Sequence, residues 1–253
     1  MAGLGSRFQK AAHLNPEYKK PKPFIKIKNK PMIQWALESL PTDLIVDPKK
    51  IIFICRQDHQ DEFQIADKLK KIFTNAINII LIEKVTRGAA ETVLKAKELI
   101  NTTEDILISD SDHYFDGKAL YKKIKNKDPK TMGIIPVFKP PDNEPKWSFS
   151  LVESGDVITA VGEKDAELAA KGAYANIGGY YFTHGNIFVQ EAEEMINEND
   201  LYGDKGKKEF YVAPLYNRLI KKGMKIVAAI TPKVCGLGTP KDVEFFIKDH
   251  RQK

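Results

Sequence analysis

The sequence predicts an α/β protein with a mixed, mostly parallel sheet that carries helices on both faces and has an antiparallel extension in its second half. Two patterns indicate this. In the first half, short apolar runs typical of buried strands alternate with amphipathic segments of helical period. In the second half, strand-like runs follow one another with few helices between them. Alternating strands and helices favour a parallel sheet covered on both faces, and consecutive strands favour antiparallel pairing.

The first half begins irregularly and then alternates. Residues 15–23 are polar and rich in proline, which predicts a loop. Residues 24–28 alternate like a short strand, and Pro31 suits the first turn of a helix that carries Met32 and Trp35. The units that follow are predicted as strands at 51–55, 77–82 and 106–109 and as helices at 59–73 and 88–100.

The second half is predicted to be richer in strands. Strand-like runs occupy residues 132–138, 149–153, 157–162 and 177–182. Helices return at 187–197 and 211–222, before a strand at 225–230 and a closing helix after Pro240. The sequence contains no internal repeat, and we interpret residues 1–253 as a single domain.

Composition excludes several classes of protein. A chain of 253 residues with 42% apolar and 29% charged residues is globular. Its net charge of +6 attracts anions such as phosphorylated metabolites but is too small to indicate nucleic acid. No apolar stretch is long enough to span a bilayer, and the N-terminus lacks the pattern of a signal peptide. Cys55 and Cys235 are far apart and are interpreted as structural thiols, so we expect a reduced, cytoplasmic protein with no membrane partner.

The opening segment from Gly3 to Arg7 brings two glycines, a hydroxyl and a guanidinium close together. Glycines let backbone amides approach phosphate oxygens, and an arginine pairs with phosphate through two hydrogen bonds. The segment lacks the third glycine of a dinucleotide-binding turn and the Lys-Ser/Thr of a P-loop. A triphosphate site is one interpretation, and an incidental glycine turn is the other.

A second candidate cation follows in Pro21-Lys22-Pro23. Flanking prolines restrict the backbone, so the Lys22 ammonium would be delivered to one place at low entropic cost. It would then act beside Arg7. The alternative is a solvated surface charge.

Carboxylates follow the apolar run 106–109, in the sequence Asp110-Ser-Asp112-His113. In open α/β sheets ligands bind beyond the carboxyl ends of strands, and oxygen donors there suit magnesium or manganese bound together with phosphates. Side chains alternate between the two faces of an extended strand, and we expect only one of the two aspartates to meet the metal. The alternative is that the aspartates cap a turn, with His113 as a polar neighbour.

Six motifs occur along the chain in one order and span nearly all of it. They are Gly3-x-Gly-Ser-Arg7, Pro21-Lys-Pro23, a strand ending in Ser111-Asp112, Glu163-Lys164, Gly178-Gly-Tyr-Tyr-Phe182 and Gly236-Leu-Gly-Thr-Pro240. This order resembles that of the nucleotidyltransferases that activate sugar phosphates and related small phosphates. Segments 53–56, 86–92, 145–148 and 209–217 are similar to a bacterial capsule-biosynthesis subgroup that includes CTP:phosphoglutamine cytidylyltransferase.

The resemblance implies a Rossmann-like nucleotide-diphospho-sugar transferase fold and a defined reaction. A nucleoside monophosphate from a triphosphate, CTP being favoured, would be joined to phosphoglutamine or a sugar 1-phosphate, with release of pyrophosphate, for capsule or surface-polysaccharide synthesis. Mg²⁺ or Mn²⁺ would be the cofactor. Residues 1–130 would form a nucleotide-binding half and residues 131–253 an acceptor-binding half, in a monomer or homodimer.

The resemblance also implies residue roles. Arg7, Lys22 and Asp112 would be catalytic, with Lys22 at the α-phosphate and Asp112 as the metal ligand. The nucleotide would contact Ala2, Gly3, Gly5, Ser6, Arg56, Gly88 and Ala89. The acceptor would contact Trp147, Glu163, Lys164, Asn176, Gly178, Gly179, Glu209 and Tyr211.

The chain departs from the family pattern in two places. The family has a strand that leads into the glycine loop, whereas this sequence starts at Met1 inside the motif. We therefore expect either a true start further upstream or a shortened form whose neighbouring strands lack a partner. In addition, residues 234–237 offer no carboxylate where many relatives place a second metal-binding aspartate, which leaves a second protein ligand unidentified.

Two other functions fit parts of the pattern. Asp110-Ser-Asp112 resembles the Asp-x-Asp of a nucleotide-sugar-dependent glycosyltransferase, although the glycine loop and Pro-Lys-Pro argue against it. A non-catalytic nucleotide-binding protein is the third interpretation. Release of pyrophosphate from a triphosphate separates the first function from the second, and stabilisation by nucleotide without product formation would favour the third.

Overall fold

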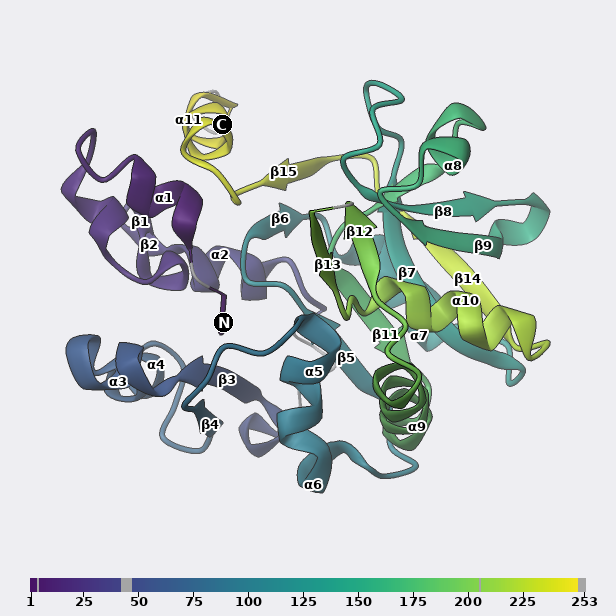
Figure 1. Ribbon diagram of the computed structural model, residues 1–253, viewed down its shortest axis with the longest axis horizontal. Coiled ribbons are helices and arrows are strands. Elements are labelled where there is room, and N and C mark those ends of the chain that lie inside the picture. The colour runs from purple at the N-terminus through teal and green to yellow at the C-terminus, as the bar shows by residue number, and fades with distance from the viewer. Residues whose placement is uncertain (4, 42–46, 205, 250–253) are drawn as a thin grey trace. The chain divides into compact units, whose positions relative to one another are not determined.

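The computed structural model describes residues 1–3, 5–41, 47–204 and 206–249 (Figure 1). Contacts divide the chain into two compact units. Unit 1 comprises Met1–Val85, Asp110–Gly117 and Lys233–Lys253, and unit 2 comprises Thr86–Ser109 and Lys118–Pro232. Both ends of the chain thus belong to unit 1. The interpretation as one domain with halves meeting near residue 130 stays a prediction.

Unit 1 contains short strands and helices from three segments of the chain. Its helices are α1 (Ser6–Lys10), α2 (Met32–Glu38), α3 (Gln57–Phe63), α4 (Ile65–Ile72) and α11 (Pro240–Asp249), with 3-10 turns at Pro16–Lys19, Lys22–Phe24 and Pro48–Lys50. Its strands are β1 (Lys26–Ile27), β2 (Lys30–Pro31), β3 (Ile52–Arg56), β4 (Asn78–Ile82), β6 (His113–Phe115) and β15 (Val234–Gly236). The loop predicted over 15–23 is therefore partly 3-10 helical, and the strand predicted over 24–28 shrinks to two residues.

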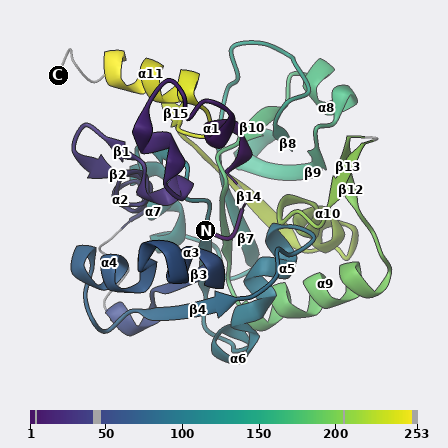
Figure 2. The ribbon, with the colours of Figure 1, turned by 60° about the vertical axis from the view of Figure 1, so that its left-hand side comes forward.

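Two apolar clusters hold unit 1 together. One includes Phe8, Met32 and Phe246, which join α1, α2 and α11. The other includes Phe53 of β3 and Leu69 of α4. The parallel pair β3 and β4 lies beside α3 and α4 in both views (Figures 1 and 2).

The helix predicted over 59–73 is broken in two. Gln64 has a φ of 52°, in the left-handed region, and separates α3 from α4. The apolar pattern continues through this break, because Ile65 and Leu69 still face the cluster under β3. The sequence pattern alone therefore could not reveal the break.

Unit 2 is built on a seven-stranded sheet in the order β10-β8-β9-β14-β7-β11-β5. Its strands are β5 (Ile106–Ser109), β7 (Thr131–Phe138), β8 (Ser148–Val152), β9 (Val157–Glu163), β10 (Tyr174–Asn176), β11 (Gly179–Phe182) and β14 (Lys225–Ile230), beside the hairpin β12 (Tyr202–Asp204) and β13 (Lys207–Glu209). Its helices are α5 (Ala89–Val93), α6 (Lys97–Ile100), α7 (Lys118–Lys125), α8 (Ala166–Ala170), α9 (Gly185–Asn197) and α10 (Ala213–Lys221), with 3-10 turns at Leu94–Ala96 and Ser154–Asp156.

The mixed α/β class predicted from the sequence is confirmed. Parallel pairing joins β14 to β7 and β3 to β4, and the other strand pairs among the described residues are antiparallel. The antiparallel share is thus larger than the sequence pattern indicated. Within the described ranges, β5 pairs with β11 alone and β3 pairs with β4 alone.

Stacked aromatic rings lie in the core of unit 2. Tyr216 of α10 is fully buried, and its ring stacks on that of Phe182 with 4.4 Å between centroids. A Cβ at Gly133 of β7 would lie 2.4 Å from the Tyr216 ring, so only glycine lets α10 approach the sheet this closely. Of the helices in the described part of the chain, none combines the length and apolar character needed to cross a membrane.

Candidate active site

The central contact of the site joins Lys22 and Asp112, which are 90 residues apart in the sequence. The Lys22 Nζ donates a hydrogen bond of 2.6 Å to Asp112 Oδ2. Pro21 and Pro23 are both buried on either side of Lys22, and this anchors the backbone of the short 3-10 turn that begins at Lys22. The proline-flanked Lys22 thus places its ammonium beside Asp112, and its role at a phosphate stays a prediction.

Asp110, Asp112 and His113 lie together at the junction after β5. Each offers one ligand atom, and these atoms lie within 4.8 Å of one another. His113 Nδ1 is 3.3 Å from Asp112 Oδ1. We expected only one aspartate to face the site, but extended structure ends at Ser109 and the chain bends at residues 111–112, so both carboxylates approach the same place. His113, which was expected only as a polar neighbour, offers a third ligand atom to the same cluster.

The pKa of Asp112 lies well below its ordinary value. Burial alone would raise this pKa, but the charges of Lys22, His113 and Arg7 and the hydrogen bond from Lys22 outweigh burial. The Arg7 guanidinium is thus close enough to act on Asp112 electrostatically. The carboxylate is held in its ionised form.

The glycine loop lies against Lys22. Gly5 has a φ of 65°, and a Cβ at that position would lie 3.6 Å from Lys22 Cβ. Gly3, Ser6 and Arg7 are exposed, while Ala2 is buried. Gly5 therefore lies beside the lysine, and the exposed residues Gly3, Ser6 and Arg7 flank it in the chain.

A third segment of unit 1 closes against Asp112. β15 pairs with β6, and the Leu237 amide donates a 2.7 Å hydrogen bond to the Asp112 carbonyl. A Cβ at Gly238 would lie 3.0 Å from Asp112 Oδ2 and 4.0 Å from an oxygen of Asp242. Glycine at 238 therefore leaves space beside the carboxylate. Asp242 is a carboxylate near the site that the sequence analysis missed, although Thr239-x-x-Asp242 could be recognised as a helix capping pattern.

The donor set around Asp112 fits a divalent cation. Two carboxylates and an imidazole converge within 4.8 Å, and the absent side chain at Gly238 keeps the approach open. Carboxylate oxygens are the ligands that magnesium and manganese prefer. Asp110 and Asp112 are thus the residues that would hold such an ion, with His113 beside them.

Arg56 lies at the carboxyl end of β3 and is already paired. Its Nε donates a 2.9 Å hydrogen bond to Asp58 Oδ1, and a second guanidinium nitrogen pairs with the other carboxylate oxygen. A nucleotide would have to compete with Asp58 for this side chain. The contact with nucleotide predicted for Arg56 stays a prediction.

Four of the residues predicted to contact the acceptor lie in or directly beside three strands of unit 2, namely β8, β9 and β10. The Lys164 amide donates a 2.9 Å hydrogen bond to the Trp147 carbonyl, and the register pairs Ser148 with Glu163. Asn176 is buried and donates to Ser148 Oγ at 3.2 Å. In the part of the chain that the structure describes, the buried indole Nε1 of Trp147 has no hydrogen-bond partner. A buried donor without a partner is costly, so it is suited to a ligand oxygen.

The other predicted residues of unit 2 lie in two places. Gly178, with a φ of 80°, and Gly179 lead into β11, where a Cβ at Gly179 would lie 3.0 Å from Pro136. Gly88 and Ala89 begin α5 and lie against Phe210, the residue between Glu209 and Tyr211. No role was expected for Phe210 itself, although it lies in segment 209–217, and two main-chain hydrogen bonds join it to Arg87 and Ala90.

Solved structures of other proteins are similar to this chain in fold. A structure of the nucleoside-diphosphate-sugar pyrophosphorylase from Vibrio cholerae RC9 is similar, with a TM-score of 0.76, 22% identity and 98% of each chain covered. The inositol-1-phosphate CTP transferase from T. maritima gives a TM-score of 0.68 at 14% identity, covering 98% of this chain and 94% of that one. The nucleotide-diphospho-sugar transferase fold predicted from the sequence is thereby confirmed.

Sequence comparison agrees with the structural likeness. The bifunctional protein GlmU of Thermosipho melanesiensis is 25% identical over 214 residues, which cover 85% of this chain. The matched part is 41% of the length of that relative. The model of the family described as nucleotidyl transferase matches residues 16–224, which is most of the chain, and the chain therefore belongs to the nucleotidyl transferase family.

Proposed function

We propose that the chain transfers a nucleoside monophosphate from a nucleoside triphosphate to a small phosphorylated acceptor and releases pyrophosphate. Cytidine is the favoured base, and phosphoglutamine or a sugar 1-phosphate is the favoured acceptor, in capsule or surface-polysaccharide synthesis. The Lys22–Asp112 pair carries this proposal, because a cation and a carboxylate suited to a divalent metal lie side by side next to the glycine loop. The family match supports the reaction class.

The chemistry needs charge neutralisation more than a base. A phosphate monoester has its second pKa near 6, so an acceptor oxygen is already ionised at neutral pH. That oxygen forms a bond to the α-phosphorus while the bond from the α-phosphorus to the bridging oxygen breaks, and pyrophosphate leaves with the electron pair. Like charges about 4 Å apart repel by about 4 kcal/mol at an effective dielectric of 20, so several cations must act together.

Each side chain has a place in this scheme. Arg7 and the amides of the glycine loop would bind the triphosphate, Lys22 would bind the α-phosphate, and Lys164 would bind the phosphate of the acceptor. A divalent cation held by Asp110 and Asp112 would neutralise phosphate charge. The unpartnered Trp147 Nε1 would donate to an oxygen in the variable part of the acceptor.

The experiment is a matrix of four triphosphates against sugar 1-phosphates, phosphocholine and phosphoglutamine, followed by pyrophosphate release in magnesium. Lys22→Ala and Asp112→Ala should each lower turnover by about a hundredfold or more, as loss of one preorganised charge does. Lys20→Ala is the matched control, since Lys20 lies on the same segment but pairs with Glu17. Near-normal turnover in a folded Lys22→Ala protein would remove Lys22 from the mechanism, and release of nucleotide from a nucleotide sugar would indicate a glycosyltransferase instead.

A further inference from the structure

Phe210 ties two distant segments of unit 2 together through its main chain. The Phe210 amide donates a 3.0 Å hydrogen bond to the carbonyl of Arg87, and the Ala90 amide donates a 2.9 Å hydrogen bond to the carbonyl of Phe210. The Phe210 side chain is fully buried, and the Arg87 guanidinium lies 4.8 Å from the centre of its ring. The amide and the carbonyl of Phe210 thus both bind the segment from Arg87 to Ala90, which is more than a hundred positions away in the chain.

The fit between the two segments depends on glycine at position 88. A Cβ there would lie 2.4 Å from both the nitrogen and the oxygen of Phe210, and these are backbone atoms that cannot turn aside. The Gly88 carbonyl is also held, because Thr92 Oγ1 donates to it at 3.0 Å. The segment from Arg87 to Ala90 and the segment around Phe210 therefore form one packed piece, which cannot shift at one side without shifting at the other.

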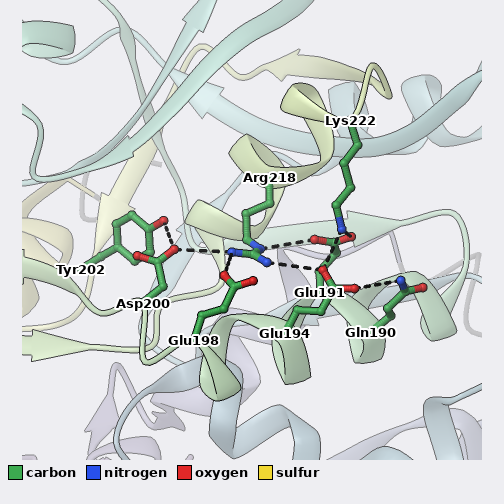
Figure 3. Close-up of polar contacts among 8 residues, drawn as sticks. All are labelled: Gln190, Glu191, Glu194, Glu198, Asp200, Tyr202, Arg218 and Lys222. Atoms are coloured by element: carbon green, nitrogen blue, oxygen red, sulfur yellow. Dashed lines mark hydrogen bonds and ion pairs between the residues drawn. The ribbon is translucent and has the colours of Figure 1, made fainter.

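The chain on the N-terminal side of Phe210 is fixed as well. Tyr202, at the start of β12, donates a 2.6 Å hydrogen bond to Asp200, and Asp200 lies 3.6 Å from the Arg218 guanidinium (Figure 3). Arg218 of α10 and Lys222 at its C-terminal cap pair with Glu191 and Glu194 of α9 and with Glu198 at the cap of α9 (Figure 3). The hairpin of β12 and β13 thus runs between two anchored points. A displacement at Glu209 or Tyr211 acts directly on Phe210, because both residues are its neighbours in the chain.

We propose that Phe210 is a positioning residue that couples recognition of the nucleotide to recognition of the acceptor. The inference rests on the proposed function, in which Gly88 and Ala89 contact the nucleotide and Glu209 and Tyr211 contact the acceptor. Ligand contacts on one segment stiffen the other through the two main-chain hydrogen bonds. Each substrate then favours binding of the other, and the factor is the same in both directions because binding linkage is reciprocal.

The test compares three variants with the wild-type protein. Phe210→Leu keeps the main-chain bonds but loses the ring against Arg87, and Gly88→Ala forces the two backbones apart. Gly206→Ala is the matched control, since a Cβ in this turn of the same hairpin meets no atom within 4 Å. Calorimetry measures the Kd of phosphoglutamine and of glucose 1-phosphate with and without a non-hydrolysable CTP analogue and magnesium.

In the wild-type and Gly206→Ala proteins, the CTP analogue should tighten binding of the acceptor that is used by about fivefold or more, and the acceptor should tighten binding of the analogue by the same factor. In Phe210→Leu this factor should fall, and in Gly88→Ala it should approach one. Full coupling in a folded Gly88→Ala protein, or no coupling in an active wild-type protein, would overturn the inference.

Hydrogen exchange separates failure of this inference from failure of the proposed function. Without any ligand, the amides of Ala90 and Phe210 should lose protection together in Gly88→Ala, while both stay protected in Gly206→Ala. If no triphosphate and acceptor pair releases pyrophosphate, the proposed function fails, and coupling between the segments is then decided by exchange alone. Loss of protection at Ala90 with none at Phe210 would show that the segments move independently.

Discussion

Replacement of Arg218 by methionine tests how unit 2 tolerates its buried charge. The guanidinium contacts four carboxylates, those of Glu191 at 3.3 Å, Glu194 at 3.4 Å, Glu198 at 2.7 Å and Asp200 at 3.6 Å (Figure 3). Glu191 and Glu194 lie three positions apart on α9, and Glu198 follows four positions later at the C-terminal cap, so all three face the same side. Like charges in this arrangement repel one another unless a cation lies between them.

The loss of folding free energy in Arg218→Met can be worked out from the ion pair that each carboxylate loses. Glu191 is 3% exposed and Arg218 is 15% exposed, and removal of one partner of a buried pair costs about 3 to 5 kcal/mol. Glu191 keeps its contact with the Lys222 ammonium, which places the cost near the lower value. The more exposed pairs with Glu198 and Asp200 add less than about 1 kcal/mol each. We expect a total of about 3 to 5 kcal/mol, or a Tm lowered by about 6 to 20 °C.

Urea unfolding followed by circular dichroism measures this loss. Lys171→Met is the control in the same unit, because Lys171 pairs with Glu167 one helical turn away and both side chains are well exposed. That variant should lose less than about 0.5 kcal/mol. A loss below about 1 kcal/mol in Arg218→Met would refute the view that this guanidinium neutralises a buried carboxylate.

Two further predictions concern titratable groups. Hydrogen bonds from Lys222 and Gln190 lower the pKa of Glu194 to about 2 from its ordinary 4.5. The ionised carboxylate therefore stabilises the folded protein fully above pH 4.5, and this contribution to folding stability is lost as the pH falls toward 2. The Tm should therefore fall over that window, and by less in Lys222→Met; equal falls in both proteins would contradict this. Burial raises the pKa of Cys55 to about 11 and closes off its thiol, so a thiol reagent should label it only after unfolding, and fast labelling of the folded protein would refute the assignment.

The elements that the sequence predicts best are those with a strong apolar run between polar residues. β5 and β14 lie where the pattern placed them, at Ile106–Ser109 and Lys225–Ile230. α7 escaped notice because its lysines mask the apolar face formed by Leu120 and Ile124. The left-handed turn at Gln64 has no signature, since its neighbours keep the helical period.

Some features of the candidate site could likewise be predicted from the sequence, and others could not. Residue chemistry drew attention to Lys22 and Asp112, and the fold brings them within 2.6 Å. The convergence of Asp110 with Asp112 depends on the bend after Ser109, which a strand-based reading cannot supply. Phe210 contributes through two main-chain hydrogen bonds, which no side-chain pattern predicts, as well as through its buried ring.

Chemistry explains the ion pair between Lys22 and Asp112 better than stability does. Removing two charges from water costs about as much as their attraction returns, so a pair with side chains 26% and 19% exposed adds little to folding. The pair does hold a cation and an ionised carboxylate in fixed positions beside the glycine loop. Charges already in place need no reorganisation when phosphates arrive, and such preorganised electrostatics usually supply the largest part of a rate enhancement. A site with this arrangement is suited to transfer between two anions.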